Sequence, residues 1–496
     1  MSGQTAAVGD AGDRRWLALA VIATAQFMVV LDVAIVNVAL PSIKTDLHFS
    51  EEDLQWVITS YSIFFGGFLL LGGRLADVLG RRRLFMAGLL LFTGASLLNG
   101  LAWSEASLIT FRSLQGLGAA MLSPAALSIL MTTFREGRER NRALGVWGAV
   151  AGSGGAAGVL LGGVLTSTFS WPWIFYVNVP VGAAVLAVSP WLLRESRAGL
   201  PHRYFDVAGA ATITAGLMLL VYGMTRATQH GWGAPATIGC LTASGVLIVS
   251  FFLVEARSKA PLLPLRILRL RTLAGSNLSG LIAGAAVFSQ FFLLTLYMQQ
   301  VLHYSALRTG VAYIALTLTT IALAAVAQGL VTRVGVRKVL PVGLTLSAVA
   351  LVLYAQVPVD GHYFTNLFPG FILSGLGLAL TFVPMAIGAL TGVRPADAGI
   401  ASGLISTSQQ IGGAIGVAVA TTIATTFTSH YVTSHAGTTP FSEAALTHGF
   451  EIAFYVLAAT AALGALVAAL MLEAQPAPAD AQRPVGDATP EGRPAP

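Results

Sequence analysis

The chain has 496 residues, of which 55% are hydrophobic and 10% are charged, and its formal net charge is +6. Soluble domains carry roughly 25% charged residues, so the composition excludes a soluble globular protein and indicates a polytopic membrane protein. The single cysteine, Cys240, excludes a disulfide framework or a cysteine-ligated metal, and the basic charge is interpreted as membrane topology rather than as nucleic-acid binding.

Fourteen apolar segments are each long enough to cross a bilayer as a helix. Lys and Arg residues between the segments fall almost entirely on the side of the N-terminus, and only Lys44, Arg226 and Arg308 fall on the other side. This bias predicts that both termini are cytoplasmic. The predicted spans cover residues 15–40, 54–73, 84–103, 106–130, 143–167, 173–193, 206–226, 236–255, 272–299, 309–331, 339–357, 365–390, 400–427 and 449–472.

Asp32 interrupts the first apolar run, which extends from Trp16 to Leu40. A carboxylate in the middle of such a helix costs about 2.5–3.5 kcal/mol to insert. Asp32 lies roughly 13 Å from the outer end of the run at a rise of 1.5 Å per residue, which is too far for its short side chain to reach the membrane surface. We therefore expect a functional carboxylate that lines a water-filled cavity, rather than a tolerated acid near a helix end.

Two loops of similar composition follow the second and the tenth segments. Residues 73–83 read Gly-Arg-Leu-Ala-Asp-Val-Leu-Gly-Arg-Arg-Arg, and residues 329–338 read Gly-Leu-Val-Thr-Arg-Val-Gly-Val-Arg-Lys. Both place a glycine turn and a basic cluster on the same side of the membrane. This repetition predicts two halves related by an axis along the membrane normal, with the seventh and eighth segments inserted between them.

The first of these loops resembles the loop motif of the major facilitator superfamily, Gly-x-Leu-Ala-Asp-x-x-Gly-Arg-[Arg/Lys], without a gap. Residues 108–120, with Arg112 inside a membrane segment, resemble the helix-4 motif of that superfamily. Three more stretches resemble its fourteen-helix drug:proton antiporter branch, the EmrB/QacA type: residues 27–41 its helix-1 motif, residues 170–182 its entry into helix 6, and residues 398–403 with 409–416 its helix 13.

The resemblance implies an all-α polytopic membrane protein with the major facilitator fold, in which two six-helix bundles are joined by two inserted helices. The last residues are rich in Pro, Ala, Asp and Glu, cannot bury apolar surface and are expected to be disordered. The predicted organisation is a cytoplasmic N-terminus at 1–14, an N-terminal six-helix bundle at 15–200, an inserted two-helix hairpin with a basic cytoplasmic linker at 201–271, a C-terminal six-helix bundle at 272–472 and a disordered cytoplasmic tail at 473–496.

The resemblance also implies that Asp32 and Arg112 act together in proton coupling. Arg112 lies about 9 Å into the fourth segment, close to the depth of Asp32, so both charges are expected to face a common cavity. The guanidinium favours the ionised form of the carboxylate, while burial favours the neutral form. Opening of the cavity or arrival of substrate can therefore shift Asp32 from one form to the other. A static ion pair that only fixes helix packing is the alternative.

A conformational latch made by Gly73, Asp77, Gly80 and Arg81 is a further implication of the resemblance. In this interpretation the Asp77 carboxylate lies near the N-terminus of a neighbouring helix, where the helix dipole favours an anion, and it holds an outward-facing state. Enrichment of basic residues on the cytoplasmic side explains the other arginines of this loop, but it does not explain an acid at this position.

The fifth segment keeps the glycines of the helix-5 antiporter motif but has Val159 in place of the usual proline, and Ala34 stands where threonine is common in helix 1. Small residues at this spacing let helices approach closely, so a packing role is expected, while the link to antiport is weakened. The glycines of the motif are Gly154, Gly158, Gly162 and Gly163.

Polar residues in the membrane segments are candidates for the walls of a substrate cavity, because amide and aromatic side chains suit bulky lipophilic ligands. Hydrogen bonds between helices explain each of them equally well. No second acid falls near the middle of a segment, which favours neutral or monocationic lipophilic substrates. The candidates are Gln26, Asn37, Gln115, Asn178, Gln290, Tyr297 and Gln409.

The sequence contains no phosphate-cradling Gly-x-x-x-x-Gly-Lys-[Ser/Thr] loop, so transport is expected to be driven by the proton gradient, without a cofactor or a metal. The sequence thus predicts a monomeric, proton-coupled exporter in the cytoplasmic membrane, an antiporter of lipophilic drugs or antibiotics that works by alternating access, and not an enzyme. A dedicated exporter of one endogenous secondary metabolite is the alternative. An uptake symporter is less favoured because of the antiporter motifs, and a polytopic membrane enzyme because the 8 histidines are scattered.

Overall fold

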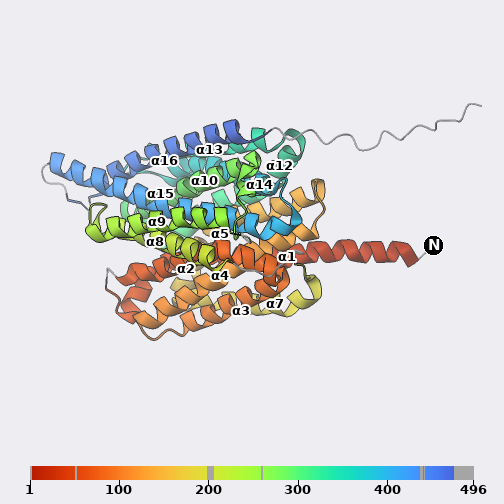
Figure 1. Ribbon diagram of the computed structural model, residues 1–496. Helices are drawn as coiled ribbons and strands as arrows, with labels where there is room; N and C mark the ends of the chain where they lie inside the picture. The colour runs from red at the N-terminus through yellow and green to blue at the C-terminus, as the bar shows by residue number, and fades with distance from the viewer. Residues whose placement is uncertain are drawn as a thin grey trace, which may run out of the picture.

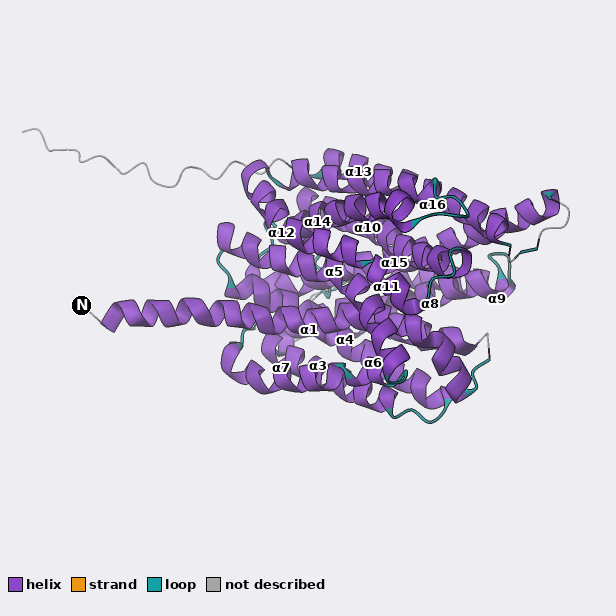
Figure 2. Ribbon diagram, turned by 180° about the vertical axis from the view of Figure 1, so that it is seen from behind, coloured by secondary structure: helices purple, strands orange, loops and turns teal. Residues whose placement is uncertain are grey.

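The computed structural model describes residues 3–50, 53–197, 206–258, 261–435, 439–440 and 442–473. Within these ranges the chain is helical and contains no strand (Figure 2). The predicted disordered tail lies outside the described residues from residue 474 on.

The helices are described in three groups along the chain. The N-half comprises α1 (Gly3–Leu47), α2 (Trp56–Leu79), α3 (Arg81–Gly100), α4 (Glu105–Thr133), α5 (Arg138–Thr168), α6 (Trp173–Tyr176) and α7 (Asn178–Leu192). The hairpin comprises α8 (Val207–His230) and α9 (Pro235–Arg257). The C-half comprises α10 (Arg271–Leu296), α11 (Ala306–Ala312), α12 (Ile314–Val334), α13 (Val336–Ala355), α14 (Phe368–Leu390), α15 (Ala398–Ser434) and α16 (Glu443–Met471).

Among the described residues, 13 helices are long and apolar enough to cross a membrane, or up to 14 if the bent pair Arg138–Gly155 and Ala157–Thr168 counts as one span. These two parts of α5 are bent by 42° relative to each other. The all-α, fourteen-helix prediction is therefore confirmed. The sixth predicted segment is built from α6 and α7, which together run from Trp173 to Leu192.

The first helix continues past the predicted end of its apolar run at residue 40. Pro41 lies inside α1, which ends at Leu47. The polar residues after Pro41 extend the helix beyond the apolar part, and Asp46 there accepts a hydrogen bond of 2.7 Å from Trp171 Nε1. Apolar length marks the membrane-spanning part of a helix, and it does not mark where the helix itself ends.

The helices lie side by side in one bundle, from which the N-terminal part of α1 projects (Figure 1). We call this end the basic end, because the arginines Arg81, Arg82 and Arg83 begin α3 there, and we call the opposite end the far end. The N-half and the C-half meet where α2 packs on α15 and where α5 packs on α12 and α14. The hairpin lies over the first of these two contacts, because α8 packs against both α2 and α15 (Figure 1).

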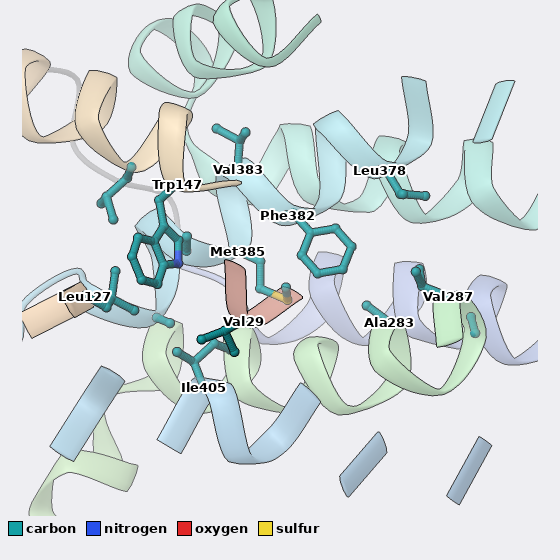
Figure 3. Packing of buried hydrophobic residues seen from close by; sticks show 14 of the residues in the cluster. Val29, Leu127, Trp147, Ala283, Val287, Leu378, Phe382, Val383, Met385 and Ile405 are labelled. Atoms are coloured by element: carbon teal, nitrogen blue, oxygen red, sulfur yellow. The ribbon is translucent and has the colours of Figure 1, made fainter. Parts of the chain in front are cut away.

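Apolar side chains from both halves fill the space between them (Figure 3). Val29 of α1 and Trp147 of α5 lie close to Met385 of α14 and Ile405 of α15 in this cluster. All four side chains are buried. Burial of apolar surface between the halves provides close packing there without any requirement for hydrogen bonds.

Glycines of α5 let this helix approach two different partners. A Cβ atom at Gly158 would lie 2.7 Å from the Leu31 carbonyl oxygen of α1, so only glycine permits this spacing. A Cβ atom at Gly148 would lie 2.8 Å from Cα of Val383 in α14. The backbone of α5 thus closely approaches α1 in its own half and α14 in the other half, as small residues allow in membrane helices.

Candidate functional site

Asp32 and Arg112 form an ion pair inside the N-half. Arg112 Nη1 lies 2.6 Å from Asp32 Oδ2, and the two side chains are 1% and 0% exposed. The sequence predicts that these two charges lie at a similar depth in the membrane, and in the structure they contact each other directly. A carboxylate and a guanidinium that are both removed from solvent must satisfy each other, because breaking such a pair leaves an uncompensated buried charge.

Two side-chain amides complete the surroundings of the Asp32 carboxylate. Gln115 Nε2 and Asn178 Nδ2 donate to Asp32 Oδ1 over 2.8 and 3.1 Å. Both amides also donate to Ser96 Oγ of α3, over 2.9 and 3.0 Å. Gln115 and Asn178 are two of the predicted cavity residues; the structure places them around the Asp32 carboxylate, and their role in a substrate cavity stays a prediction. With Arg112 they give this carboxylate three donors, which suit its ionised form.

Arg112 is held by several groups besides Asp32. Its Nε donates to the Val57 carbonyl over 3.0 Å, and its Nη1 also donates to Gln115 Oε1 over 2.7 Å. The guanidinium carbon lies 4.3 Å from the ring centroid of Tyr61, which is close enough for a cation–π contact. The positive charge is thus fixed in position by α2 and α4, so a change in protonation of Asp32 acts on a charge that stays close to it.

We call the hydrogen-bonded group of Asp32, Arg112, Gln115, Asn178, Ser96 and Asn99 the Asp32 cluster. It lies toward the far end of the bundle. Val57 is the second residue of α2, Asn178 is the first residue of α7, and Arg112 is the eighth residue of α4. All three helices lie in spans that begin at the far end, because the chain runs along α1 from the basic end and reverses direction between successive spans, α6 and α7 forming one span. The buried carboxylate is therefore separated from the basic end by most of the length of the bundle.

At the basic end, Asp77 joins the two halves. Its two carboxylate oxygens accept hydrogen bonds of 3.2 Å from the backbone N–H groups of Gly399 and Ile400, in the first turn of α15. Arg81 Nη2 donates to Asp77 over 2.8 Å and to the Pro395 carbonyl of the C-half over 2.6 Å. The predicted arrangement, an acid at the N-terminus of a neighbouring helix, is present, and the helix dipole stabilises the carboxylate there.

The backbone N–H groups in the first turn of α15 are available to Asp77 because Asp397, the N-cap residue of α15, bonds to other side chains. Asp397 makes no side-chain cap, and its carboxylate instead accepts hydrogen bonds from Arg266 and Arg394 over 3.2 and 3.0 Å. Arg266 belongs to the short helix η2 (Leu265–Arg269), which follows the hairpin. The linker after the hairpin therefore contacts the same turn of α15 that Asp77 holds.

Glycines allow the close contact between α2 and α15 around Asp77. The backbones of Gly73 in α2 and Gly399 in α15 touch directly, and Gly80 adopts φ 114°, which a residue with a Cβ atom rarely adopts. After Gly80, the carboxylate of Glu195 accepts the backbone N–H groups of Arg82 and Arg83 over 3.2 Å. A side chain from the end of the N-half thus stabilises the N-terminus of α3.

The remaining cavity candidates lie in different surroundings. Asn37 is exposed and donates to its own helix at Val33, and Tyr297 donates from its hydroxyl to the Pro358 carbonyl over 2.6 Å. Gln26 Oε1 and Gln290 Nε2 are buried and have no hydrogen-bond partner among the described residues. Gln409 lies 3.9 Å from the Met385 sulfur. Their assignment to a substrate cavity stays a prediction.

The helix-5 glycines face α1. Cβ atoms at Gly154 and Gly162 would meet Val30 and Ile35 of α1 at 2.7 and 2.8 Å, as at Gly158, and Gly163 is buried. The expected close approach of helices is present around this motif. Its connection with antiport stays a prediction.

Two residues of the Asp32 cluster were not identified from the sequence. Ser96 and Asn99 of α3 belong to the Asp32 cluster, and Asn99 Nδ2 donates to Gln115 Oε1 over 2.7 Å. Each of them is an isolated polar residue in an apolar segment, which gives no periodic signal. In the described part of the chain, no group of three or more His, Cys, Asp or Glu residues lies close enough to hold a metal ion.

Comparison with known proteins identifies relatives of the whole chain. The family model of the Major Facilitator Superfamily matches residues 22–417 and 277–495. The puromycin resistance protein pur8 of Streptomyces alboniger is 39% identical over 481 residues, which cover 96% of this chain and 95% of that protein. The cephamycin export protein CmcT of Amycolatopsis lactamdurans is 42% identical over 401 residues, covering 80% and 82% of the two chains.

A more distant relative and a solved structure agree with these matches. The tetracenomycin C resistance and export protein of Streptomyces glaucescens is 35% identical over 407 residues, which cover 81% of this chain and 74% of that protein. The crystal structure of the human organic anion transporter MFSD10 (TETRAN) aligns with a TM-score of 0.61 at 17% identity, covering 92% of this chain and 99% of that one. At this identity the structural match shows a shared fold alone.

Proposed function

The chain belongs to the major facilitator superfamily, and from that premise we propose that it is a proton-coupled exporter of antibiotics or similar lipophilic small molecules. It is a multi-pass membrane protein. The observation that carries the proposal is the buried Asp32–Arg112 pair, with a 0% exposed carboxylate held by three donors. The relatives named above, two export proteins and a resistance protein, support export of an antibiotic as the transport activity.

Proton coupling is supported by the chemistry of the Asp32 cluster. A carboxylate with a fixed guanidinium beside it is stable as an anion, and it becomes neutral when a proton displaces its donors. Movement of a bare charge through a closed, apolar membrane protein is costly, so the neutral form favours the transition between the two orientations of the transporter. Proton binding at one side and release at the other then drive substrate in the opposite direction.

Alternating access is supported by the position of the Asp77 latch. The latch joins α2 of the N-half to α15 of the C-half at the basic end, which the charge bias predicts to be cytoplasmic. In this interpretation both termini are cytoplasmic and the structure represents a state that is closed toward the cytoplasm. Breaking the two N–H···O bonds and the Arg81 contact to Pro395 opens the protein to the cytoplasm, where substrate binds.

A neutral or monocationic lipophilic substrate fits the surface between the halves. The side chains that meet there, such as Trp147, Phe382 and Met385, are apolar, and Asp32 lies within the N-half in contact with Arg112. Apolar and aromatic surface with few polar groups is typical of sites for lipophilic ligands. A dedicated exporter of one secondary metabolite is the second candidate, because the relatives include export proteins named for a single antibiotic.

The experiment is export from cells that lack their own drug pumps. We expect cells with this protein to keep puromycin, a cephamycin, lincomycin or tetracenomycin C at a lower internal concentration than cells with an empty vector. An uncoupler of the proton gradient should abolish that difference for every transported compound. Export of several unrelated compounds supports a multidrug exporter, and export of one supports a dedicated exporter. A substrate gradient that persists after the proton gradient is collapsed contradicts the proposal.

A further inference from the structure

The Asp32 cluster continues beyond the carboxylate toward the far end of the bundle. Asn99 Nδ2 donates to Gln115 Oε1 over 2.7 Å, and Gln115 Nε2 donates to Asp32 Oδ1 over 2.8 Å. Asn99 is the penultimate residue of α3, one position before Gly100 and directly ahead of the connection to α4. Two hydrogen bonds therefore lead from the buried carboxylate to the last turn of a helix at the far end.

The orientation of both amides along this chain of contacts is fixed by their neighbours. Gln115 Oε1 accepts from Arg112 and Asn99, and its Nε2 faces the Asp32 carboxylate and Ser96 Oγ. Turning the Gln115 amide around would place its oxygen against the carboxylate, and turning Asn99 would place two carbonyl oxygens together. Both flips replace attraction by repulsion, so Asn99 Oδ1 points away from the cluster.

Asn99 Oδ1 is the acceptor at the outer end of this chain of contacts, and no described residue donates to it although Asn99 is 0% exposed. A buried acceptor without a donor costs about 1–3 kcal/mol. Water or a hydronium ion supplies the missing O–H donor and is the ligand that matches a lone amide oxygen. The amides between that oxygen and Asp32 already hydrogen-bond to each other, so they can position water beside the carboxylate but do not carry a proton themselves.

Tyr176 lies at the end of α3, next to the residue that follows Asn99. Its hydroxyl donates to the Gly100 carbonyl over 2.6 Å, and its ring contacts the position where a Gly100 side chain would stand. It is partly exposed, and Trp173 packs edge-on against it at 5.8 Å between ring centroids. One aromatic side chain from α6 thus packs against the last residue of α3.

We infer that Asn99 and Gln115 form the inner lining of a proton access route from the far end of the N-half to Asp32, separate from the surface where the two halves meet. This inference rests on the proposed proton coupling. A hydronium ion held at Asn99 Oδ1 passes its proton through water to the Asp32 carboxylate, which becomes a neutral acid while the hydronium becomes water. Gln115 then loses its ionic acceptor and keeps Ser96. Asn99 is a positioning residue for the water and does not itself carry the proton.

The test compares two fluxes in proteoliposomes that contain the purified full chain. Substrate-driven proton movement requires the route, whereas counterflow of labelled against unlabelled substrate requires no net proton transfer. We expect Asn99→Leu to lower the proton-coupled flux by about tenfold or more and to leave counterflow within about twofold of wild type, which is small on the scale of mutational effects. Asn99→Ser, which keeps an oxygen and leaves room for water, should retain most of the coupled flux.

Thr93→Val is the matched control, because Thr93 is also a buried polar residue of α3 whose oxygen has no partner among the described residues, but it lies outside the cluster. It should leave both fluxes unchanged. The inference is overturned if Asn99→Leu retains the wild-type coupled flux, or if Asn99→Leu and Asn99→Ser lower both fluxes together. If wild-type protein moves substrate without protons, the proposed function is overturned and this inference with it, which is a different result from a failure confined to the Asn99 variants.

Discussion

Asp77 of α2 accepts a backbone hydrogen bond from Gly399 of α15, and it occupies the place where a residue of α15 would ordinarily cap that helix. The N-half therefore supplies the anion that the first turn of a C-half helix requires. Twenty residues earlier on the same helix, the Val57 carbonyl holds Arg112 of the Asp32 cluster. At 1.5 Å per residue the two contacts are about 30 Å apart, so α2 connects the buried ion pair with the latch.

Asp77→Asn should impair transport while leaving membrane insertion and expression largely intact. The amide removes the negative charge from the N-terminus of α15 and from the 2.8 Å pair with Arg81, but it removes no apolar contact. The closed state at the basic end loses stability, and the balance shifts toward the opposite orientation. The measurement is substrate transport in proteoliposomes at equal protein density.

Asp53→Asn is the control for this latch variant, because Asp53 is an exposed acid at the far end whose hydrogen bonds to described residues lie within its own turn. It should transport normally. A cysteine at Ala401, which is 0% exposed in the closed state, should react faster with a thiol reagent in the Asp77→Asn background once Cys240 is removed. If Asp77→Asn shows the transport and the thiol labelling of the wild type, Asp77 has no gating role.

The sequence predicted this latch in outline but not its partners. Residues 73–83 predict a loop with a glycine turn followed by a basic cluster, whereas α2 continues to Leu79 and the turn lies at Gly80, with φ 114°, directly before Arg81. The partner helix begins more than 300 residues later, and nothing local to Gly399 indicates an open N-terminus. That opening arises because Asp397 pairs with Arg266 and Arg394. Contacts between segments far apart in the chain follow from packing, which periodicity and motif spacing do not encode.

The Asp32 cluster was predictable to a similar extent. The cost of burying a charge singles out Asp32 and Arg112 from the sequence alone, and helix depth places them together. Gln115 and Asn178 also stand out as polar residues in apolar segments, but the sequence does not tell which face of a helix borders a cavity and which borders another helix. Their contacts with Asp32 depend on how α3, α4 and α7 pack around α1.

Arg266→Gln should loosen the closed basic end slightly. Arg266 joins the linker after the hairpin to Asp397, but it is 55% exposed, and exposed ion pairs contribute about 0–1 kcal/mol. We therefore expect a small rise in the rate of thiol labelling at a cysteine replacing Ala401, and no measurable change in thermal unfolding. Arg269→Gln, in the same short helix and also exposed, should change neither quantity. An equal response to both substitutions would show that overall charge, rather than the contact with Asp397, governs the opening.

Gly158→Ala should destabilise the N-half. The new Cβ atom would lie 2.7 Å from the Leu31 carbonyl oxygen and 2.8 Å from the Ala34 side chain, so α1 and α5 must move apart. Overpacking of this kind costs about 1–3 kcal/mol. Gly94→Ala is the matched control in α3, where no described atom outside the neighbouring backbone of α3 itself lies within 4 Å of the new Cβ. It should be neutral or stabilise the helix by up to about 1 kcal/mol. The measurement is thermal unfolding in detergent, and effects of the same sign at both positions would contradict a contact-specific cost.

Asp32→Asn should abolish export against a gradient and the release of protons on substrate binding, while substrate binding and downhill exchange remain measurable. The amide mimics the protonated carboxylate permanently, so it cannot take up and release a proton. It also leaves the buried charge of Arg112 without its counter-ion, and breaking a buried pair costs about 3–5 kcal/mol. Loss of stability must therefore be separated from loss of coupling. Asp32→Glu keeps the charge and should retain partial activity.

The double variant Asp32→Asn with Arg112→Gln makes that separation. It removes both charges, so no uncompensated ion remains, and Gln115 together with the Val57 carbonyl can bond the new amides. We expect thermal stability to recover most of what Asp32→Asn loses, because neutral replacements of a buried ion pair are often close to isoenergetic with it. Coupled export should stay absent, since no carboxylate remains in the cluster. The deciding measurement is substrate-induced proton release from purified protein at several pH values: if either variant releases protons with the wild-type stoichiometry, the coupling carboxylate lies elsewhere and the assignment of Asp32 is wrong.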